Sequence, residues 1–402
     1  MRLSALLDGL PQPLAPAKSE RRQFSVDPII RGIGYDSRTT SPGDLFVALR
    51  GSVSDGHDYI ERAVNAGAVA VLAEEALSPK RLGDAVAVVV PDTRQALAEL
   101  AQIFFGRPSE SLSLIGITGT NGKTSTSYLV ESILKAAEHR TALIGTVEIR
   151  YAGARTPSVN TTPESLDLQR TLRDMCTQGI EDVVMEVSSH GLELGRVSGC
   201  HFNVAAFTNL TQDHLDFHGS MEAYRSSKAR LFGEFLNQGG TAVINIDDPS
   251  APAMIEAAQA SEARLIRCAR QQGHDADVWL ENASIRIEGT RARVHLDHQP
   301  LDLEIPLLGD FNLENVLIAC GIGHALGLSP EEIARGIQAC PQVPGRMEVV
   351  RSKLKDSPTV LVDYAHTPDA IEKLLTAVRP LCLLYTSPSP RDATLSRMPS
   401  SA

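Results

Sequence analysis

A glycine-rich segment near the middle of the chain combines residue types that bind nucleotide phosphates. Residues 116–124 read GITGTNGKT and follow an apolar run at 112–117. Glycines let the backbone curl so that successive N–H groups face phosphate oxygens, while a lysine reaches the terminal phosphates and a threonine hydroxyl binds Mg²⁺. Five residues, rather than four, separate Gly116 from Gly122, so this is a variant P-loop. The order of strand, turn and helix favours phosphate binding by Lys123 and Thr124 over a plain glycine-rich turn.

A second polar cluster follows the apolar run 182–186, where Glu186 precedes the residues VSSH at 187–190. In sheets of parallel strands, ligands bind beyond the carboxyl ends of the strands. Mg²⁺ favours oxygen ligands and takes one or two carboxylates, so Glu186 is a candidate to share a Mg²⁺ ion with Thr124 and the phosphates. Its position alone is equally compatible with a surface charge.

Metal-capable side chains also follow the next apolar run, in the segment 208–218, which reads TNLTQDHLDFH. Two alternatives stay open for this segment. Asp213 or Asp216 could cap a helix, and His214 and His218 have a spacing that zinc sites use. The aspartates and their setting suit hard cations better than zinc.

Lys228 lies on the helix that we expect after this segment. An ammonium group beside Mg²⁺ repels the metal, so the residues alone favour a solvated helix lysine. Addition of CO₂ would convert this side chain into an anionic oxygen ligand, but spacing does not establish that.

Apolar runs and helical patterns alternate along the chain, which is typical of a mainly parallel sheet covered by helices. Strands are expected at 45–49, 69–73, 86–90, 112–117, 141–144, 182–186, 203–207, 241–246, 264–268 and 359–362, and helices at 59–66, 94–105, 125–137, 313–326 and 330–339. Residues 279–306 change to the two-residue period of an antiparallel β ribbon. We therefore expect an α/β protein in which the strand ends bring the polar clusters together.

The same pattern suggests how the chain is divided. We expect a small N-terminal α/β domain at 1–108, a central P-loop domain at 109–340 and the start of a third α/β domain at 341–380. The boundary near 108 follows from Pro108, because the residue before a proline is pushed out of helical geometry. Residues 381–402 are rich in Ser, Pro and Arg and have no period, so they are either a disordered tail or, as we favour, a foreign or frame-shifted end.

Composition limits the classes of function. The chain has 402 residues, of which 43% are hydrophobic and 22% charged, and its net charge is −11. This is ordinary for a globular protein and, without a basic run, argues against a nucleic-acid partner or membrane insertion. No apolar segment is long enough to cross a bilayer. Six scattered cysteines without a Cys-x-x-Cys pair suggest neither zinc nor disulfides, so we expect a cytoplasmic enzyme.

Five motifs occur together in one order. They are the P-loop 118–124, the residues NTTP at 160–163, EVSSH at 186–190, DHLD at 213–216, and a segment that contains Tyr224, Lys228, Leu231 and Phe232. As a set they resemble the Mur ligases, and the resemblance extends from about Tyr35 to Arg379. It implies an ATP-dependent amide ligase of peptidoglycan synthesis that acts on UDP-N-acetylmuramoyl-L-alanyl-D-glutamate.

The resemblance also implies residue roles. For ATP it implies Gly119, Thr120, Asn121, Gly122, Lys123, Thr124 and Ser125 at the phosphates, Asn315, Arg346 and Asp363 around adenine and ribose, and His366 in a loop facing the phosphates. For the substrate it implies Ser37 at the uridine nucleotide, and Thr161, Thr162, Ser188 and Arg196 at the muramoyl dipeptide. Two Mg²⁺ ions would be held by Thr124, Glu186, His214 and a CO₂ adduct of Lys228, the lysine carbamate. The catalytic set is then Lys123, Glu186, His214 and Lys228.

The sequence departs from the family after residue 380, where the implied amino-acid pocket and an Asp-Asn-Pro-Arg segment typical of diaminopimelate are not found. We therefore expect this chain to bind ATP and the UDP-sugar peptide without positioning the amine. The N-terminal and central motifs as a whole favour meso-diaminopimelate as the third amino acid, with lysine as the alternative. Two other functions stay open: a ligase of the folylpolyglutamate type and a nucleotide-binding module without ligation.

Overall fold

The computed structural model describes residues 1–15, 26–51, 54–271, 275–350, 359–365 and 368–379. The predictions for His366 and for the segment 381–402 lie outside the described residues. Among the described residues, no helix has the length and apolar character needed to cross a membrane.

A four-stranded parallel sheet in the order β1-β2-β3-β4 is formed by the N-terminal residues. Its elements are α1 (Leu3–Asp8), β1 (Gly32–Gly34), β2 (Asp44–Val47), η1 (Gly56–Tyr59), α3 (Ile60–Asn65), β3 (Ala70–Ala73), α4 (Pro79–Leu82), β4 (Val86–Val89) and α5 (Thr93–Phe104). All four residues of β3 are buried, as expected for a parallel strand covered on both faces. The Asp92 side chain caps α5 by accepting from the N–H groups of Arg94 and Gln95.

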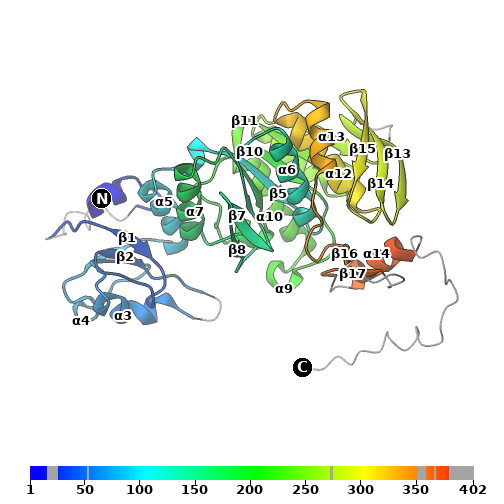
Figure 1. Cartoon of the computed structure of the whole chain (residues 1–402). Coiled ribbons are helices and arrows are strands. Elements are labelled where there is room, and N and C mark those ends of the chain that lie inside the picture. Colours follow the sequence, from blue (N-terminus) through cyan, green and yellow to red (C-terminus); the bar gives the residue numbers. More distant parts are fainter. Residues whose placement is uncertain (16–25, 52–53, 272–274, 351–358, 366–367, 380–402) are drawn as a thin grey trace, which may run out of the picture.

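Figure 1 shows this four-stranded sheet at one end of the molecule, with α5 beside α7 (Ser165–Thr177). The predicted strands are confirmed; α1 was not predicted.

The central sheet has eleven strands in the order β15-β14-β13-β12-β11-β10-β5-β9-β6-β7-β8. They are β5 (Ser113–Thr118), β6 (Thr141–Ile144), β7 (Glu148–Tyr151), β8 (Ala154–Pro157), β9 (Asp182–Glu186), β10 (Phe202–Phe207), β11 (Leu236–Asn245), β12 (Arg264–Ala269), β13 (Val278–Arg286), β14 (Gly289–Leu296) and β15 (Gln299–Ile305). Neighbours from β6 to β13 are parallel, and both edges are antiparallel. The expected ribbon is confirmed, and it continues the sheet because β13 pairs with β12. The hairpin of β7 and β8 was not predicted.

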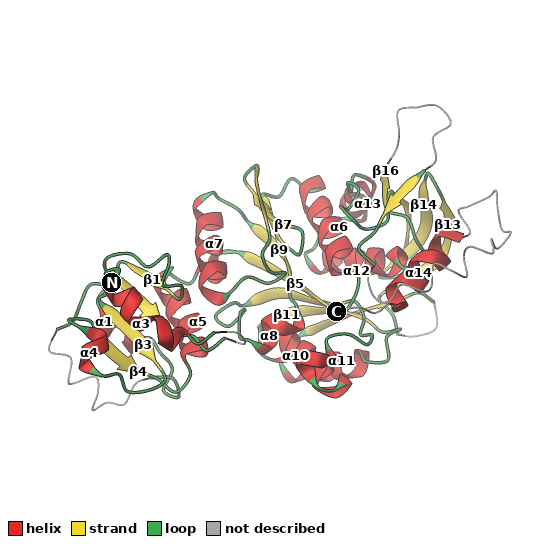
Figure 2. Cartoon of the chain, turned by 90° about the horizontal axis from the view of Figure 1, so that it is seen from below, coloured by secondary structure: helices red, strands yellow, loops and turns green. Residues whose placement is uncertain are grey.

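Helices cover both faces of this sheet because its central strands are apolar on both sides. Ile115 and Ile117 pack with α6 (Lys123–Ala136), α12 (Asn312–Ala325) and α13 (Pro330–Gln338). On the opposite face, Leu114 and Phe207 pack with α7, α10 (Met221–Gly233) and α11 (Ala251–Ala260). Figure 2 shows α6 and α7 on opposite sides of β7 and β9. The remaining short elements are η2 (Pro108–Ser111), α8 (Ser189–Glu193) and α9 (Leu215–His218).

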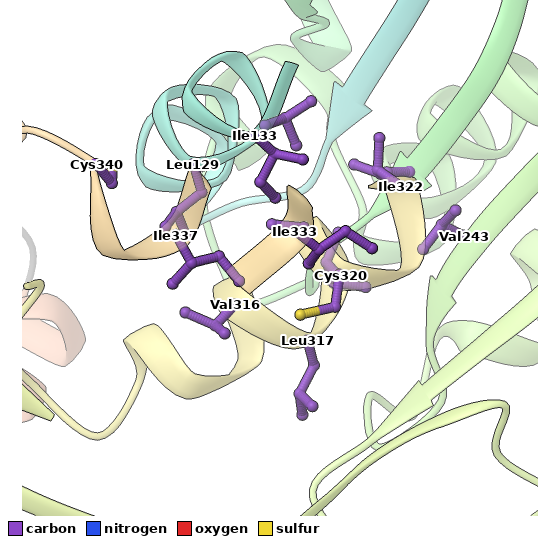
Figure 3. Packing of buried hydrophobic residues seen from close by; sticks show 14 of the residues in the cluster. Leu129, Ile133, Val243, Val316, Leu317, Cys320, Ile322, Ile333, Ile337 and Cys340 are labelled. Carbon is purple, nitrogen blue, oxygen red and sulfur yellow. The ribbon is translucent and has the colours of Figure 1, made fainter. Parts of the chain in front are cut away.

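The packing of α6, α12 and α13 anchors the helix that follows the P-loop. Ile133 of α6 and Ile333 of α13 lie in one buried cluster (Figure 3). The two helices approach closely at Gly336, where a Cβ would lie 2.3 Å from the Ile133 Cα. The Ser132 hydroxyl donates to the Gly336 carbonyl at 2.7 Å. These contacts hold the C-terminal half of α6 against α13.

The last described residues form a two-stranded antiparallel sheet, β16 (Glu348–Val350) and β17 (Val360–Val362), followed by α14 (Pro368–Val378). The strand expected at 359–362 is thus confirmed. Hydrogen bonds tie β17 to the preceding turn: the Tyr364 N–H donates to the Gly345 carbonyl at 2.8 Å and the Met347 N–H to Asp363 Oδ2 at 2.7 Å.

Candidate active site

The central sheet changes direction at β5. The chain leaves β5 toward β6 and β9 on one side, and later places β10 on the other side of β5. Loops that diverge in this way leave a crevice beyond the carboxyl ends of the strands, where ligands bind. The loops after β5, β6, β9 and β10 therefore meet at one edge of the sheet.

The loop after β5 has the backbone conformation of a phosphate cradle. Gly119 and Gly122 have φ values of +150° and +87°, which other residues rarely adopt. There is also no room for a side chain, since a Cβ on Gly119 would lie 1.9 Å from the Thr208 hydroxyl and one on Gly122 2.2 Å from Asn315 Oδ1. Gly122 precedes the first turn of α6, so the N-terminus of this helix faces the crevice.

The loop after β10 holds the phosphate loop in place. The Thr120 N–H donates to the Asn209 carbonyl at 2.8 Å, and the Asn121 N–H donates to Asn209 Oδ1 at 2.9 Å. The Thr208 hydroxyl donates to the Asn121 carbonyl at 2.7 Å. Sequence reasoning assigned no role to Asn209 or Thr208, although both follow an apolar strand.

Glu186 is buried beside the phosphate loop, so its interpretation as a surface charge is wrong. Its carboxylate accepts from the Thr124 hydroxyl at 3.0 Å and from the Thr146 N–H and hydroxyl, each at 2.9 Å. Thr146 was missed, yet its position just after β6 is the same signal that identified Glu186. Glu186 and Thr124, which were expected to share a Mg²⁺ ion, are thus hydrogen-bonded to each other, and their binding of the ion stays a prediction.

Thr124 and Glu186 suit a Mg²⁺ ion that binds at the same time as a nucleotide. The described residues contain no group of three or more His, Cys, Asp or Glu side chains arranged to hold a metal alone. Mg²⁺ usually takes one or two carboxylates and completes its shell with phosphates and water. The buried Thr124–Glu186 pair supplies that kind of donor set.

Lys228 is buried, 1% exposed, so its interpretation as a solvated helix lysine is wrong. Its Nζ donates to the Gly119 carbonyl at 2.9 Å and lies 4.5 Å from the centre of the Tyr224 ring. Lys123 Nζ donates to the same carbonyl at 2.8 Å and to that of Thr120 at 2.9 Å. Burial, followed by the charge of Lys123, holds the pKa of Lys228 well below its ordinary value. Both causes favour the neutral amine over the ammonium form.

His214 lies in a turn next to the same residues. Its φ is +51°, and its ring packs against those of His190 and Tyr224, with centroids 4.7 and 6.2 Å away. The alternative of an N-cap at Asp213 or Asp216 is wrong, because α9 has no side-chain cap and Ser220 caps α10.

The residues assigned to the muramoyl dipeptide adjoin Glu186. The Thr162 hydroxyl donates to the Glu186 carbonyl at 3.0 Å and lies 3.2 Å from the Ser188 hydroxyl. Thr161 and Thr146 have their hydroxyls 3.0 Å apart. Arg196 Nη1 donates to the Thr162 carbonyl at 3.0 Å. The structure therefore brings these four residues to the same end of the central sheet as the phosphate loop.

The residues assigned to adenine and ribose come from two places. Asn315 is buried on α12, where its Oδ1 accepts from the Thr126 hydroxyl at 3.4 Å. Asp363 accepts from the N–H groups of Met347 and Ala365, and the Arg346 guanidinium lies 5.3 Å from the Tyr364 ring centre. The charge of Arg346 also contributes to lowering the pKa of Lys123, after burial as the main cause.

Two assigned residues remain. Ser125 is buried in the first turn of α6. Ser37 is buried in the turn after β1, at the carboxyl end of the smaller sheet. It belongs to the other sheet and is not part of the cluster around Glu186.

A phosphate loop between diverging strands, with a buried threonine and carboxylate beside it, defines a P-loop nucleotide-binding protein of the α/β class. Three family models match the chain: "Mur ligase family, catalytic domain" at residues 29–105, "Mur ligase middle domain" at 117–323 and "Mur ligase, glutamate ligase domain" at 345–385. The chain belongs to the Mur ligase family. It is accordingly an ATP-dependent amide ligase.

Individual relatives agree with this assignment. The chain is 44% identical over 363 residues to the UDP-N-acetylmuramoyl-L-alanyl-D-glutamate–2,6-diaminopimelate ligase of Bacillus licheniformis, covering 88% of this chain and 72% of that one. A solved structure with the same enzyme name is 34% identical with a TM-score of 0.75, covering 88% of this chain and 70% of that one. A folylpolyglutamate synthase of Mycobacterium tuberculosis is 20% identical, with a TM-score of 0.60 and coverage of 71% and 70%, which shows a shared fold only.

Proposed function

We propose that this ligase joins meso-diaminopimelate to UDP-N-acetylmuramoyl-L-alanyl-D-glutamate during peptidoglycan synthesis in the cytoplasm. The observation that carries the proposal is the position of Thr162 and Ser188. Their hydroxyls are hydrogen-bonded to each other just beyond β9, the strand whose last residue, Glu186, accepts from Thr124. A carboxylate held there would lie next to a nucleotide on the phosphate loop. Identity of 44% to a ligase named for these two substrates supports the choice over a lysine-adding ligase.

The reaction follows from the weakness of a carboxylate as an electrophile. The dipeptide carboxylate attacks the γ-phosphorus of ATP, the bond to the bridging oxygen of ADP breaks, and an acyl phosphate forms. The amine of the incoming amino acid then attacks the acyl carbon, phosphate leaves, and a proton is lost from nitrogen. Lys123 and the loop N–H groups offset the repulsion between the two anions and stabilise charge on the transferred group.

Two Mg²⁺ ions would add positive charge at the phosphates when bound. We assign Thr124 and Glu186 to the first ion, and His214 and the carbamate of Lys228 to the second. Burial lowers the pKa of Lys228 and so favours the neutral amine, which is the form that attacks CO₂; this supports the carbamate. The nitrogen bonds to the carbon of CO₂ and releases a proton, which leaves an anion with two oxygens.

The remaining assignments are part of the same proposal. ATP contacts Gly119, Thr120, Asn121, Gly122 and Ser125 at its phosphates, and Asn315, Arg346 and Asp363 at its nucleoside. Ser37 contacts the uridine nucleotide, and Thr161 and Arg196 contact the dipeptide portion. We also propose the division into units at 1–108, 109–340 and from 341 onward.

Hydroxylamine trapping tests the first step on the 402-residue chain. With ATP, Mg²⁺ and the UDP-sugar dipeptide present together, we expect a hydroxamate of the dipeptide and an equal amount of phosphate. Omission of any one of the three removes the product. Phosphate release that does not need the dipeptide would contradict the proposal and favour a nucleotide-binding module without ligation. Replacing hydroxylamine with meso-diaminopimelate or with lysine then tests which amine the ligase joins to the dipeptide.

A further inference from the structure

Two ion pairs connect the N-terminal unit, through α5, with the residues assigned to the muramoyl dipeptide. Arg94, in the first turn of α5, has its Nη1 3.0 Å from Glu164 Oε2. The other oxygen of the same carboxylate lies 2.9 Å from Arg196 Nε. All three side chains are largely buried, with 24, 17 and 14% exposed. Glu164 is thus shared by two guanidinium groups that come from different parts of the sequence.

Glu164 occupies a position where this sharing affects the site. It is the residue before the first turn of α7, and only Pro163 separates it from Thr162. Arg196 in turn donates from Nη1 to the Thr162 carbonyl at 3.0 Å. The Arg196 guanidinium is therefore hydrogen-bonded to the Thr162 carbonyl through Nη1, while at Nε it forms an ion pair with Glu164 without a hydrogen bond.

The start of α7 receives a second contact from the smaller sheet. The Tyr35 hydroxyl, just beyond β1, donates to Asp167 Oδ2 at 2.5 Å. Both contacts reach the first turn of α7 from residues at the carboxyl side of the small sheet, where Ser37 also lies. The start of α7, which follows the Thr161–Thr162 turn in sequence, is thus contacted by two residues of the N-terminal unit.

We propose that Arg94 and Glu164 are positioning residues for the UDP-sugar dipeptide, acting by holding Arg196 and the Thr161–Thr162 turn in place. The inference rests on the proposed function, since it needs Arg196 to face the dipeptide. Without the carboxylate, the guanidinium groups of Arg94 and Arg196 would repel each other in a partly buried setting. Without Arg94, the carboxylate would be free to turn away from Arg196.

Calorimetric titration of the 402-residue chain measures this directly, with the UDP-sugar dipeptide and ADP as separate probes. Arg94→Ala and Glu164→Gln should each weaken dipeptide binding about tenfold, a typical coupling between sites, and leave ADP binding unchanged. Arg94→Lys should keep part of the affinity. Arg291→Ala, on β14 with 78% of its side chain exposed, is the matched control and should bind both probes as the wild type does.

The charge swap Arg94→Glu with Glu164→Arg distinguishes two roles of the ion pair: positioning Arg196, or only holding α5 against α7, which we call a clamp. It restores an opposite-charge pair between α5 and α7 but places a cation against Arg196, so we expect dipeptide binding to stay weak. Full recovery in the swap would overturn the inference, because a clamp alone would then suffice. So would dipeptide affinities within about twofold of wild type in both single variants, or an equal loss for ADP accompanied by a lower Tm. A wild-type chain that does not bind the dipeptide would instead refute the proposed function.

Discussion

Lys123 and Lys228 donate to one acceptor: the Nζ atoms of both side chains lie within 2.9 Å of the Gly119 carbonyl oxygen. The two residues are far apart in sequence and arrive on α6 and α10. Burial is the main cause of the lowered pKa of each lysine. Two ammonium ions on a single carbonyl would repel each other, so the arrangement favours a neutral Lys228 that is free to react with CO₂.

Replacement of Lys228 tests the carbamate. We expect Lys228→Ala to lower hydroxamate formation by about 10²-fold or more, as for loss of a group that stabilises transition-state charge. Formate or acetate should restore part of the rate by supplying the missing oxygen. Lys228→Arg keeps a long cation but forms no carbamate, so it should be equally slow and not respond to carboxylates. An active Lys228→Arg variant would be incompatible with the carbamate.

Gly119 tests the phosphate cradle. Gly119→Ala should abolish ADP binding measured by calorimetry, because the new Cβ meets the Thr208 hydroxyl at 1.9 Å and φ is +150°. Gly153→Ala, in the turn between β7 and β8, has a positive φ of +82° but no atom within 4 Å of the added Cβ. It should bind ADP normally. Equal affinities in the two variants would mean that the cradle does not require this glycine.

The buried ion pair of Glu131 and Arg150 predicts a pH-dependent stability. Burial opposes ionisation of Glu131, but hydrogen bonds from Arg150 and Lys135 outweigh it and lower the pKa of Glu131 below 4.5. A lowered folded-state pKa stabilises the protein above the unfolded value, and this contribution is lost as pH falls through the folded value. We expect Glu131→Gln to reduce the free energy of unfolding at pH ~7 by about 3 kcal/mol, with a difference that shrinks toward pH ~3.

Urea denaturation of Glu131→Gln and wild type across this pH range is the measurement. Glu110→Gln, whose side chain is 57% exposed and pairs with Arg107 at 3.6 Å, is the control and should follow the wild-type curve. A Glu131→Gln penalty that stayed constant down to low pH would show that the ion pair is not its cause.

The close approach of α13 to α6 predicts a cost for added volume. Gly336→Ala places a Cβ 2.3 Å from the Ile133 Cα, which the backbone cannot easily relieve, so we expect a loss of about 1–3 kcal/mol in the free energy of unfolding. Gly233→Ala is the matched change, since its Cβ would meet Ala257 at an ordinary 3.6 Å. Denaturation curves should show a stability for Gly233→Ala equal to or above that of wild type.

Local sequence signals were sufficient for the phosphate loop and for Glu186. The loop depends on glycines that are adjacent in sequence, and Glu186 directly follows a buried strand, so both positions follow from the rule that ligands bind at strand ends. The same rule would have found Thr146. Lys228 was misjudged as solvated although Tyr224, Leu231 and Phe232, four before and three and four after it, are buried on the same side of α10.

Contacts between distant segments were beyond the reach of the sequence. Arg94 and Glu164 are 70 residues apart, and no local pattern relates an arginine in one helix to a residue before another. The β7–β8 hairpin was missed because β8 is exposed at every position and lacks the apolar alternation that marks a strand. Tertiary packing, rather than residue preference, decides both features.

The central claim is that the loops after β5 and β9 form one site for Mg²⁺ and nucleotide. Calorimetric titration of a non-hydrolysable ATP analogue, with Mg²⁺ and with EDTA, tests it in wild type and Glu186→Gln. We predict that Mg²⁺ strengthens binding to wild type by about tenfold or more, and that Glu186→Gln loses this gain while its affinity in EDTA is unchanged. An equal gain from Mg²⁺ in both proteins would contradict the claim.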